Sequence, residues 1–200
     1  MSQLIESISI KHGKPQHLNW HIARIRKARK ALFDLENHLS IEATITQAQA
    51  RNTLKAPWQK CRIIYAQSIE KIEFEAYCIR PVQSLQIVED NTIDYSYKYK
   101  DRSTLDRLFA QRGTCDNILI VKNGWITDSY YANVVLEQAG KFFTPRLPLL
   151  NGIQRQRLLA QNQLQCLDIA PREIMNFQHI HLINAFLSLG DCMIDTRHLF

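Results

Sequence analysis

The chain has 200 residues, of which 46% are hydrophobic and 22% are charged, and its formal net charge at pH 7 is +6. With six glycines and six prolines, this composition excludes collagen-like and long flexible chains and suits one globular domain or two small lobes. Five scattered cysteines without a CxxC pair argue against a disulfide framework or a zinc ribbon, and without a signal pattern or a membrane-length apolar run we expect a cytoplasmic protein.

Residues 1–80 are predicted to form a small N-terminal α+β lobe that ends before Pro81. Asn19 and Ser40 are candidate caps of two helices, because a side-chain oxygen at that position accepts a hydrogen bond from the first turn. The elements expected in this lobe are, in chain order, a strand at 4–10, helices at 19–35 and 41–54, and a hairpin of strands at 61–67 and 72–80.

Residues 81–200 are predicted to form a larger lobe with an antiparallel sheet. Asn-Gly at 123–124 and Ala-Gly at 139–140 each separate two β-rich runs, which predicts successive hairpins. The other elements expected here are a strand at 84–90, an extended segment at 95–100, a helix capped by Ser103 or Thr104, a helix from Ile153 and a strand at 179–187. Strands and helices without strict β-α-β alternation favour an α+β fold.

The stretch "YSYKYKDRSTLDRL" contains two lysines whose roles its pattern leaves open. Alternation places Tyr97 and Tyr99 on one side of an extended segment, and Lys98 and Lys100 on the other. By default we expect both lysine side chains to be solvated on an exposed strand, because lysine is seldom buried.

Other candidate sites are weak when each is considered by itself. Gly152 precedes a helix whose free backbone amides suit an anion, and Asp128 either finishes a turn or, if buried, needs a cationic partner. His21 and Arg24 are three residues apart on one helix face. The pairs His17–His21 and His179–His181 have no third ligand at a suitable spacing, so no metal is expected.

The basic run "RIRKARK" at 24–30 raises the alternative of a nucleic-acid-binding domain. Ile22, Ile25 and Leu32 form an apolar stripe through the same stretch, so an amphipathic helix with a basic outer face explains it as well. The chain carries no aromatic stacking motif, and we expect neither nucleic acid nor membrane as a partner.

Taken in chain order, segments around Arg24, Lys98, Asp128 and Gly152 resemble the class IV aminotransferases, the pyridoxal-phosphate (PLP) enzymes of fold type IV. The segments that carry the resemblance are "HLNWHIARI", "YKYKDRSTLDRL", "GWITDSYYANVVL", "FFTPRLPLLNGIQRQRLL" and "INAFLSLGDCMI". The resemblance covers nearly the whole chain. It implies a two-lobed fold similar to D-amino-acid aminotransferase, PLP as cofactor, a small-molecule amino substrate and a homodimer.

The resemblance also implies roles for individual residues, in one cleft to which both lobes contribute. Lys98 would be the Schiff-base lysine, Arg24 would bind the cofactor phosphate, and Asp128 would pair with the pyridine nitrogen. The backbone at Gly152, Ile153 and Gln154 would hold the phosphate as well. Arg102, Asn133 and Asn184 are expected to support the site.

Three features depart from the family pattern. Asp128 stands where the family has Glu, Gln154 stands where it has Thr, and the chain begins almost at the first motif. Because of these departures, one hypothesis is that the protein binds the cofactor but catalyses little.

The sequence also leaves two reactions of the family as alternatives. The spacing from Lys98 to Arg102 resembles aminodeoxychorismate lyase, which converts 4-amino-4-deoxychorismate to 4-aminobenzoate and pyruvate in folate biosynthesis. The alternative is an aminotransferase of branched-chain or D-amino acids.

Overall fold

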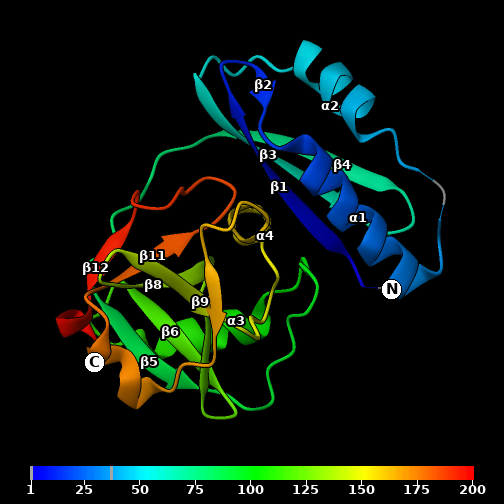
Figure 1. Cartoon of the computed structure of the whole chain (residues 1–200). Coiled ribbons are helices and arrows are strands. Elements are labelled where there is room, and N and C mark those ends of the chain that lie inside the picture. Colours follow the sequence, from blue (N-terminus) through cyan, green and yellow to red (C-terminus); the bar gives the residue numbers. More distant parts are fainter. Residues whose placement is uncertain (1, 37) are drawn as a thin grey trace. The chain divides into compact units, whose positions relative to one another are not determined.

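The computed structural model of the protein describes residues 2–36 and 38–200, and it divides into two compact units (Figure 1). The first unit holds the described residues up to Ile79 together with Tyr97–Asp101, and the second holds Arg80–Ser96 and Arg102–Phe200. Each unit has a sheet of its own, with four strands in the first and eight in the second. This architecture is α+β, as the sequence predicts. No helix in the described part of the chain is both long enough and apolar enough to cross a membrane.

The first unit is a four-stranded antiparallel sheet with the order β2-β1-β3-β4 and two helices on one face. Its elements are β1 (Leu4–Lys11), β2 (Lys14–Pro15), α1 (Leu18–Phe33), α2 (Ile41–Ala50), β3 (Trp58–Tyr65) and β4 (Ile69–Ala76). Ile8 and Ile63 of the sheet form one core with Ile25 and Ala28 of α1 and Ile45 of α2. Each fully buried isoleucine of this kind stabilises the fold by about 1.5–3 kcal/mol.

The predicted helices exist, but their caps differ from the prediction. α1 begins at Leu18, and its N-cap is His17 in the left-handed conformation with φ 54°, so Asn19 lies within the first turn. Asn19 is therefore inside the helix and not at the N-cap position, and His17 itself makes no side-chain cap bond. Ser40 does precede α2 but makes no side-chain cap bond.

The basic stretch of α1 is amphipathic. Ile25 and Ala28 are buried in the core. Arg26, Lys27 and Lys30 are exposed. The cations therefore form the outer face of a packed helix.

The second unit is built on a curled mixed sheet with the path β10-β9-β8-β7-β6-β5, and β11 joins β8 to β12. Its strands are β5 (Leu85–Glu89), β6 (Asn117–Lys122), β7 (Trp125–Ser129), β8 (Asn133–Gln138), β9 (Lys141–Pro145), β10 (Gln165–Leu167), β11 (His179–Ile183) and β12 (Met193–Asp195). The α-helices are α3 (Ser103–Phe109) and α4 (Ile153–Ala160), and short 3-10 turns lie at Ala110–Arg112, Pro171–Asn176 and Thr196–His198.

Both hairpins predicted in this unit are confirmed. Asn123 and Gly124 have φ of 52° and 79°, and Ala139 and Gly140 have φ of 48° and 73°. Two successive left-handed residues form the tight turn whose twist suits a hairpin. The sheet is mixed rather than wholly antiparallel, because β5 runs parallel to β6 and β10 runs parallel to β9.

The segment at 95–100 is not a regular strand. Tyr99 makes an isolated bridge to Leu4, and the amide of Ile5 donates to the carbonyl of Lys98 at 2.9 Å. Asp94 accepts from the amide of Ser96 and bends the chain just before this segment. Because 97–101 bonds to β1, these residues group with the first unit, whereas the division by sequence assigned them to the second lobe.

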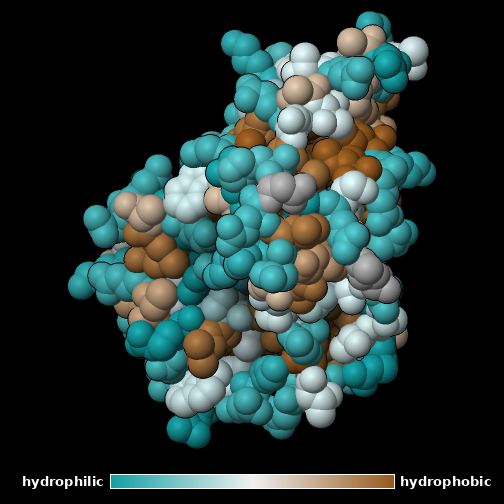
Figure 2. All heavy atoms as spheres, turned by 90° about the vertical axis from the view of Figure 1, so that its right-hand side faces the viewer, coloured by the Kyte–Doolittle hydropathy of each residue, from teal (hydrophilic) through white to brown (hydrophobic). Residues whose placement is uncertain are grey.

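Figure 2 shows hydrophilic residues over most of one face of the molecule, with hydrophobic residues at the surface in separate patches. The most exposed large apolar side chains among the described residues are Leu147, Met175 and Phe200. Such isolated apolar residues are ordinary on protein surfaces.

Candidate functional site

The residues predicted to form the site fall into two groups, one in each unit. In the first unit, Glu6 of β1 lies on the face of the sheet that packs against α1, and α1 supplies His21 and Arg24. Glu6 accepts from Nδ1 of His21 at 2.7 Å, from Nε of Arg24 at 3.1 Å and from Nη2 of Arg24. Glu6 and His21 are buried, and the Arg24 side chain is 14% exposed.

These contacts set the protonation states of the group. Burial alone would raise the pKa of Glu6, but the charge of Arg24 and the hydrogen bond from His21 outweigh it and lower the pKa to about 2. Burial lowers the pKa of His21, and its contact with Glu6 only partly opposes this. At neutral pH the group is therefore a Glu6–Arg24 ion pair beside a neutral imidazole.

Glu6 fixes the direction of the Arg24 guanidinium. Its two carboxylate oxygens accept hydrogen bonds from Nε and Nη2, which form one edge of the planar guanidinium group. Among the described residues, Nη1 of Arg24 has no hydrogen-bond partner, so the other edge can accept a second anion. The sequence prediction named Arg24 as a site residue and did not name Glu6. The available signal was an acidic residue at an inward position of an otherwise apolar strand face, between Leu4 and Ile8.

Lys98 and Lys100 differ in environment although they are two residues apart. Lys98 is half-buried, and its charge is close enough to His21 to lower the pKa of that imidazole, although burial is the main cause of the shift. Lys100 is exposed, and its ammonium donates to Oε1 of Gln3 at 2.6 Å. The first unit therefore brings Lys98, and not Lys100, toward the group of His21 and Arg24.

In the second unit, Asp128 lies at the end of β7 and is almost fully buried. Its Oδ1 accepts from Nδ2 of Asn133, and its Oδ2 accepts from the amides of Leu149 and Leu150. Burial raises the pKa of Asp128 to about 7, and these hydrogen bonds only partly oppose the shift. A carboxylate has about four acceptor positions, so roughly one remains for a further donor.

Asn133 connects Asp128 to the start of α4. Its Nδ2 also donates to the carbonyl of Leu150 at 2.7 Å. A Cβ atom built on Gly152 would lie 2.0 Å from Oδ1 of Asn133, a distance that no side chain can occupy. Gly152 has φ −67°, so the reason for glycine here is close approach and not backbone conformation. Asp128, Asn133 and Gly152 thus form one packed cluster.

The first turn of α4 presents backbone amides beside this cluster. The amides at the beginning of a helix have no partner within the helix. The N-cap residue here is Gly152, which has no side chain that could accept a hydrogen bond from them. Ile153 and Gln154 are both buried. Oε1 of Gln154 accepts from Nη1 of Arg157 at 2.6 Å, so this side chain is engaged within its own helix.

Arg155 is a buried cation that the sequence prediction missed. It donates to Oγ1 of Thr144 at 3.2 Å, to Oδ1 of Asn151 at 2.9 Å and to the carbonyl of Pro145 at 2.8 Å. It therefore ties the loop before α4 to the end of β9. The signal in the sequence was an arginine on the inward face of the helix, two residues from Ile153.

Arg102 and Asn184 hold the turn that follows Asp128. Arg102 donates to the carbonyl of Tyr130 at 2.8 Å and stacks over the Tyr130 ring at 4.5 Å. Nδ2 of Asn184 contacts the carbonyl of Tyr131 at 3.5 Å. Within the second unit, Asp128, Asn133 and Gly152 thus pack together, while Arg102 and Asn184 contact the turn that follows Asp128. In the first unit, Arg24 and Lys98 both lie near His21.

The two histidine pairs considered for a metal have other surroundings. His17 is exposed while His21 is buried on Glu6. Nδ1 of His179 and Nε2 of His181 each lie 3.1 Å from the same oxygen of Glu137. Each buried ring therefore has a carboxylate partner.

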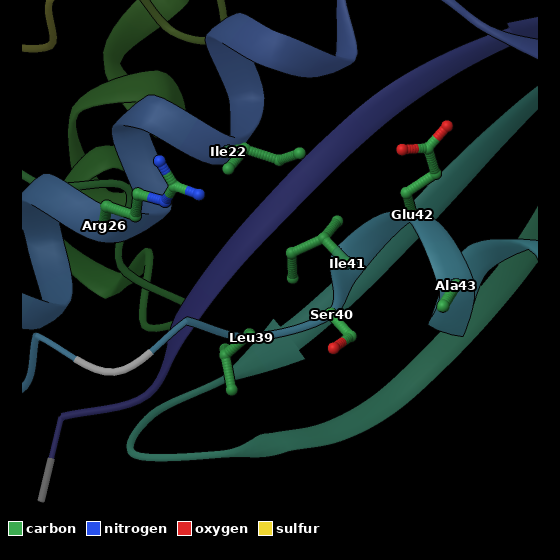
Figure 3. Close-up of a pocket in the computed structure, with 7 residues that line it drawn as sticks. All are labelled: Ile22, Arg26, Leu39, Ser40, Ile41, Glu42 and Ala43. Atoms are coloured by element: carbon green, nitrogen blue, oxygen red, sulfur yellow. The ribbon is translucent and has the colours of Figure 1, made fainter.

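A separate groove of about 440 Å³ lies between α1 and the start of α2 (Figure 3). Its lining is mostly apolar, with Arg26 and Glu42 as its charged residues, and no predicted site residue contributes to it.

Comparison with known proteins agrees with this arrangement. The family model described as amino-transferase class IV matches residues 3–190. A protein of Haemophilus influenzae, described as uncharacterized, is 35% identical over 189 residues, which are 94% of this chain and 100% of that protein.

Solved structures give the same result. A protein of Haemophilus somnus 129PT, proposed to be a 4-amino-4-deoxychorismate lyase, matches with a TM-score of 0.87 and 28% identity over 94% of this chain and 98% of its own. A hypothetical aminotransferase from Mycobacterium tuberculosis in its PLP-bound form matches with a TM-score of 0.75 and 14% identity, covering 99% of this chain and 81% of that one. Identity at that level shows a shared fold alone.

Glu6→Gln tests the buried ion pair. The substitution leaves the Arg24 charge without its partner, and we expect the free energy of unfolding of the first unit to fall by about 3–5 kcal/mol. A lowered pKa means that Glu6 stabilises the fold above its ordinary value of 4.5, and that this contribution is lost as the pH falls toward about 2. Urea unfolding from neutral pH to acid should show that loss in the wild type and not in the variant. Glu42→Gln, at an exposed position of α2, is the control. Equal effects of the two substitutions would contradict the account.

Gly152→Ala tests the contact between Asn133 and the start of α4. The added methyl group must displace the Asn133 amide, and we expect a loss of about 1–3 kcal/mol in the free energy of unfolding. The double variant Gly152→Ala with Asn133→Ala removes the clash, so its loss should be smaller than the sum of the two single losses. Additive losses in a double-mutant cycle would show that the two residues do not touch.

Proposed function

The chain belongs to the class IV aminotransferase family and has the fold of the type IV PLP enzymes, and from this premise we propose that it is a PLP-dependent enzyme whose Lys98 carries the cofactor. The observation that carries the proposal is the cluster in the second unit. There a buried acid, an amide side chain and a glycine that admits no Cβ meet at the free amides of a helix start.

The residues present fit the chemistry of PLP. Its phosphate needs donors and positive charge. In the second unit the amides of Ile153 and Gln154 are suitable donors, and in the first unit the free edge of Arg24 is a suitable cation. Gly152 lets the phosphate approach the backbone closely. The replacement of Thr by Gln154 removes one hydroxyl donor and leaves these backbone donors unchanged.

Asp128 suits the pyridine nitrogen of the cofactor. Its carboxylate has an acceptor position left, and burial has raised its pKa to about 7, so a cationic partner would favour its ionised form. When bound, PLP supplies an electron-accepting ring, which a protonated ring nitrogen makes stronger. The shorter Asp is anchored by the amides of Leu149 and Leu150, and this fixes its position.

Lys98 provides the reactive amine in this proposal. An amine acts as a nucleophile or base only when it is neutral, and desolvation with nearby cations favours the neutral form. Lys98 is half-buried, and Arg24 lies on the same side of the first unit beside His21. Its Nζ would bind the cofactor covalently and, once the substrate takes its place, would move the proton at the substrate carbon.

Substituting the two lysines separately tests the proposal. Lys98→Ala should abolish the yellow absorbance of the cofactor-loaded protein and leave any bound PLP removable by dialysis, because no covalent bond holds it. Lys100→Ala should keep the colour, since that ammonium is exposed and bound to Gln3. Absorbance spectra of both variants after loading and dialysis provide the measurement. Colour that persists in Lys98→Ala would overturn the proposal.

We further propose that the reaction is lyase-like, with 4-amino-4-deoxychorismate converted to 4-aminobenzoate and pyruvate. The spacing from Lys98 to Arg102 supports this, and so does the likeness to the Haemophilus somnus protein. The alternative is an aminotransferase of branched-chain or D-amino acids. The family resemblance also implies a homodimer and a small-molecule amino substrate, and both stay proposals.

Two parallel assays separate the reactions. With 4-amino-4-deoxychorismate alone, a lyase should release 4-aminobenzoate and pyruvate in equal amounts. An amino acid supplied with a keto acid should give no exchange beyond that seen with Lys98→Ala. Transfer to the keto acid without release of 4-aminobenzoate would instead favour the aminotransferase.

A further inference from the structure

The face of the first sheet that is turned away from α1 carries several charged residues beside an apolar row formed by Ile5 and Ile64. Along β3, Cys61 and Ile63 point into the core, so Lys60, Arg62 and Ile64 lie on the opposite face. The register places Arg62 between Ser7 of β1 and Glu73 of β4.

Two of the cations on this face form ion pairs with glutamates. Lys60 pairs with Glu75 at 2.6 Å, and Lys71 pairs with Glu73 at 2.5 Å. Arg62 lies directly across from Glu73 in the register, and its charge helps to lower the pKa of that carboxyl group, although the hydrogen bond from Lys71 is the main cause. The face therefore carries more cations than carboxylates: Arg62 of β3 and Lys11 of β1, which lies over the Trp58 ring, are outside these two ion pairs.

The guanidinium of Arg62 has an unused edge. Its Nε is buried, and within the part of the chain that the structure describes this nitrogen has no hydrogen-bond partner. Buried donors of this kind are uncommon and call for a partner outside the protein. By contrast, the Nε atoms of Arg24 and Arg155 donate to Glu6 and Thr144.

Arg62 lies close to the segment that carries Lys98. The amide of Ile5 donates to the carbonyl of Lys98 at 2.9 Å, and Ile5 pairs with Ile64 across the two strands. Ile5 and Ile64 are both buried. The row of Ser7 and Arg62 is the next on this face, and rows on one face of a strand are about 6.8 Å apart.

We propose that Arg62 is a specificity-determining residue that binds a carboxylate of the substrate, at a position remote from the amine that reacts. This proposal rests on the proposed function, in which the substrate amine reacts at the cofactor. It adds that the substrate is an amine that also carries a carboxylate. Nε and Nη2 form the planar edge that accepts a carboxylate through two parallel hydrogen bonds. The buried Ile5–Ile64 row supplies an apolar contact for the body of the substrate between Arg62 and the Lys98 segment.

A purely structural role for Arg62 makes a different prediction. A cation that only balances the glutamates of this face would be replaced by lysine without effect on a ligand. A carboxylate site would be weakened by lysine, because a single ammonium cannot form the two parallel bonds.

The experiment measures the dissociation constant of chorismate, which has two carboxylates and no amine, by calorimetry on the PLP-loaded protein. Arg62→Gln should weaken binding roughly tenfold to a hundredfold, because a pair of charge-assisted hydrogen bonds is lost. Arg62→Lys should weaken binding less. Arg26→Gln removes the same charge from the exposed face of α1 and is the matched control, with binding unchanged.

The cofactor absorbance of the same samples keeps the two proposals apart. If the wild type stays colourless, the proposed function fails, and chorismate titration of the cofactor-free protein still tests Arg62. Melting curves show whether each variant is folded. If Arg62→Gln is not folded, the comparison is made with Arg62→Lys instead. Wild-type binding that is not saturable, or equal binding by the wild type and both Arg62 variants, would overturn the assignment.

Discussion

A carboxylate that is removed from water must be given hydrogen-bond donors, and this requirement shapes both units of the protein. An unpaired buried carboxylate is too costly to keep ionised, so each one here is met by specific partners. Glu6 receives the fork of Arg24 and the imidazole of His21. Asp128 receives the Asn133 amide and two backbone amides. The donors that satisfy these acids are the groups that orient the candidate site.

The two solutions differ in charge, and this difference has a chemical meaning. Glu6 is paired with a full positive charge, so its pKa is lowered and Arg24 is held in one orientation. Asp128 accepts hydrogen bonds from neutral donors, and the charge of Arg155 acts on it only weakly, so burial dominates and its pKa is raised. A group poised near neutrality responds to the charge of whatever binds beside it. The first acid is therefore suited to fixing an arginine, and the second to responding to a ligand.

Much of this could be read from the sequence because local patterns determine it. The alternation in "LIESISI" and the Asn-Gly and Ala-Gly turns predict β1 and both hairpins of the second unit. Arg24, Lys98, Asp128 and Gly152 could be named as candidates from the order of four motifs. The neutral partners of Asp128 could not be foreseen, because the amides of Leu149 and Leu150 come from a loop 21 and 22 residues away.

Other features were missed because their cause is tertiary. Arg155 and Arg62 look like ordinary surface arginines until the fold shows which nitrogen atoms are buried. The segment of Lys98 reads as a strand by alternation, but its pairing with β1 is limited to a single bridge. Asn19 has a good capping side chain, but the helix begins at Leu18, so this side chain is not at the N-cap position.

The central claim is that Lys98 carries the cofactor, and chemical trapping tests it most directly. Borohydride reduction of the PLP-loaded wild-type protein fixes the cofactor to its lysine, and peptide mass mapping then identifies the modified residue. The account predicts one phosphopyridoxyl group per chain, located on Lys98. An adduct on Lys100, or on a lysine outside the segment 97–101, would contradict it.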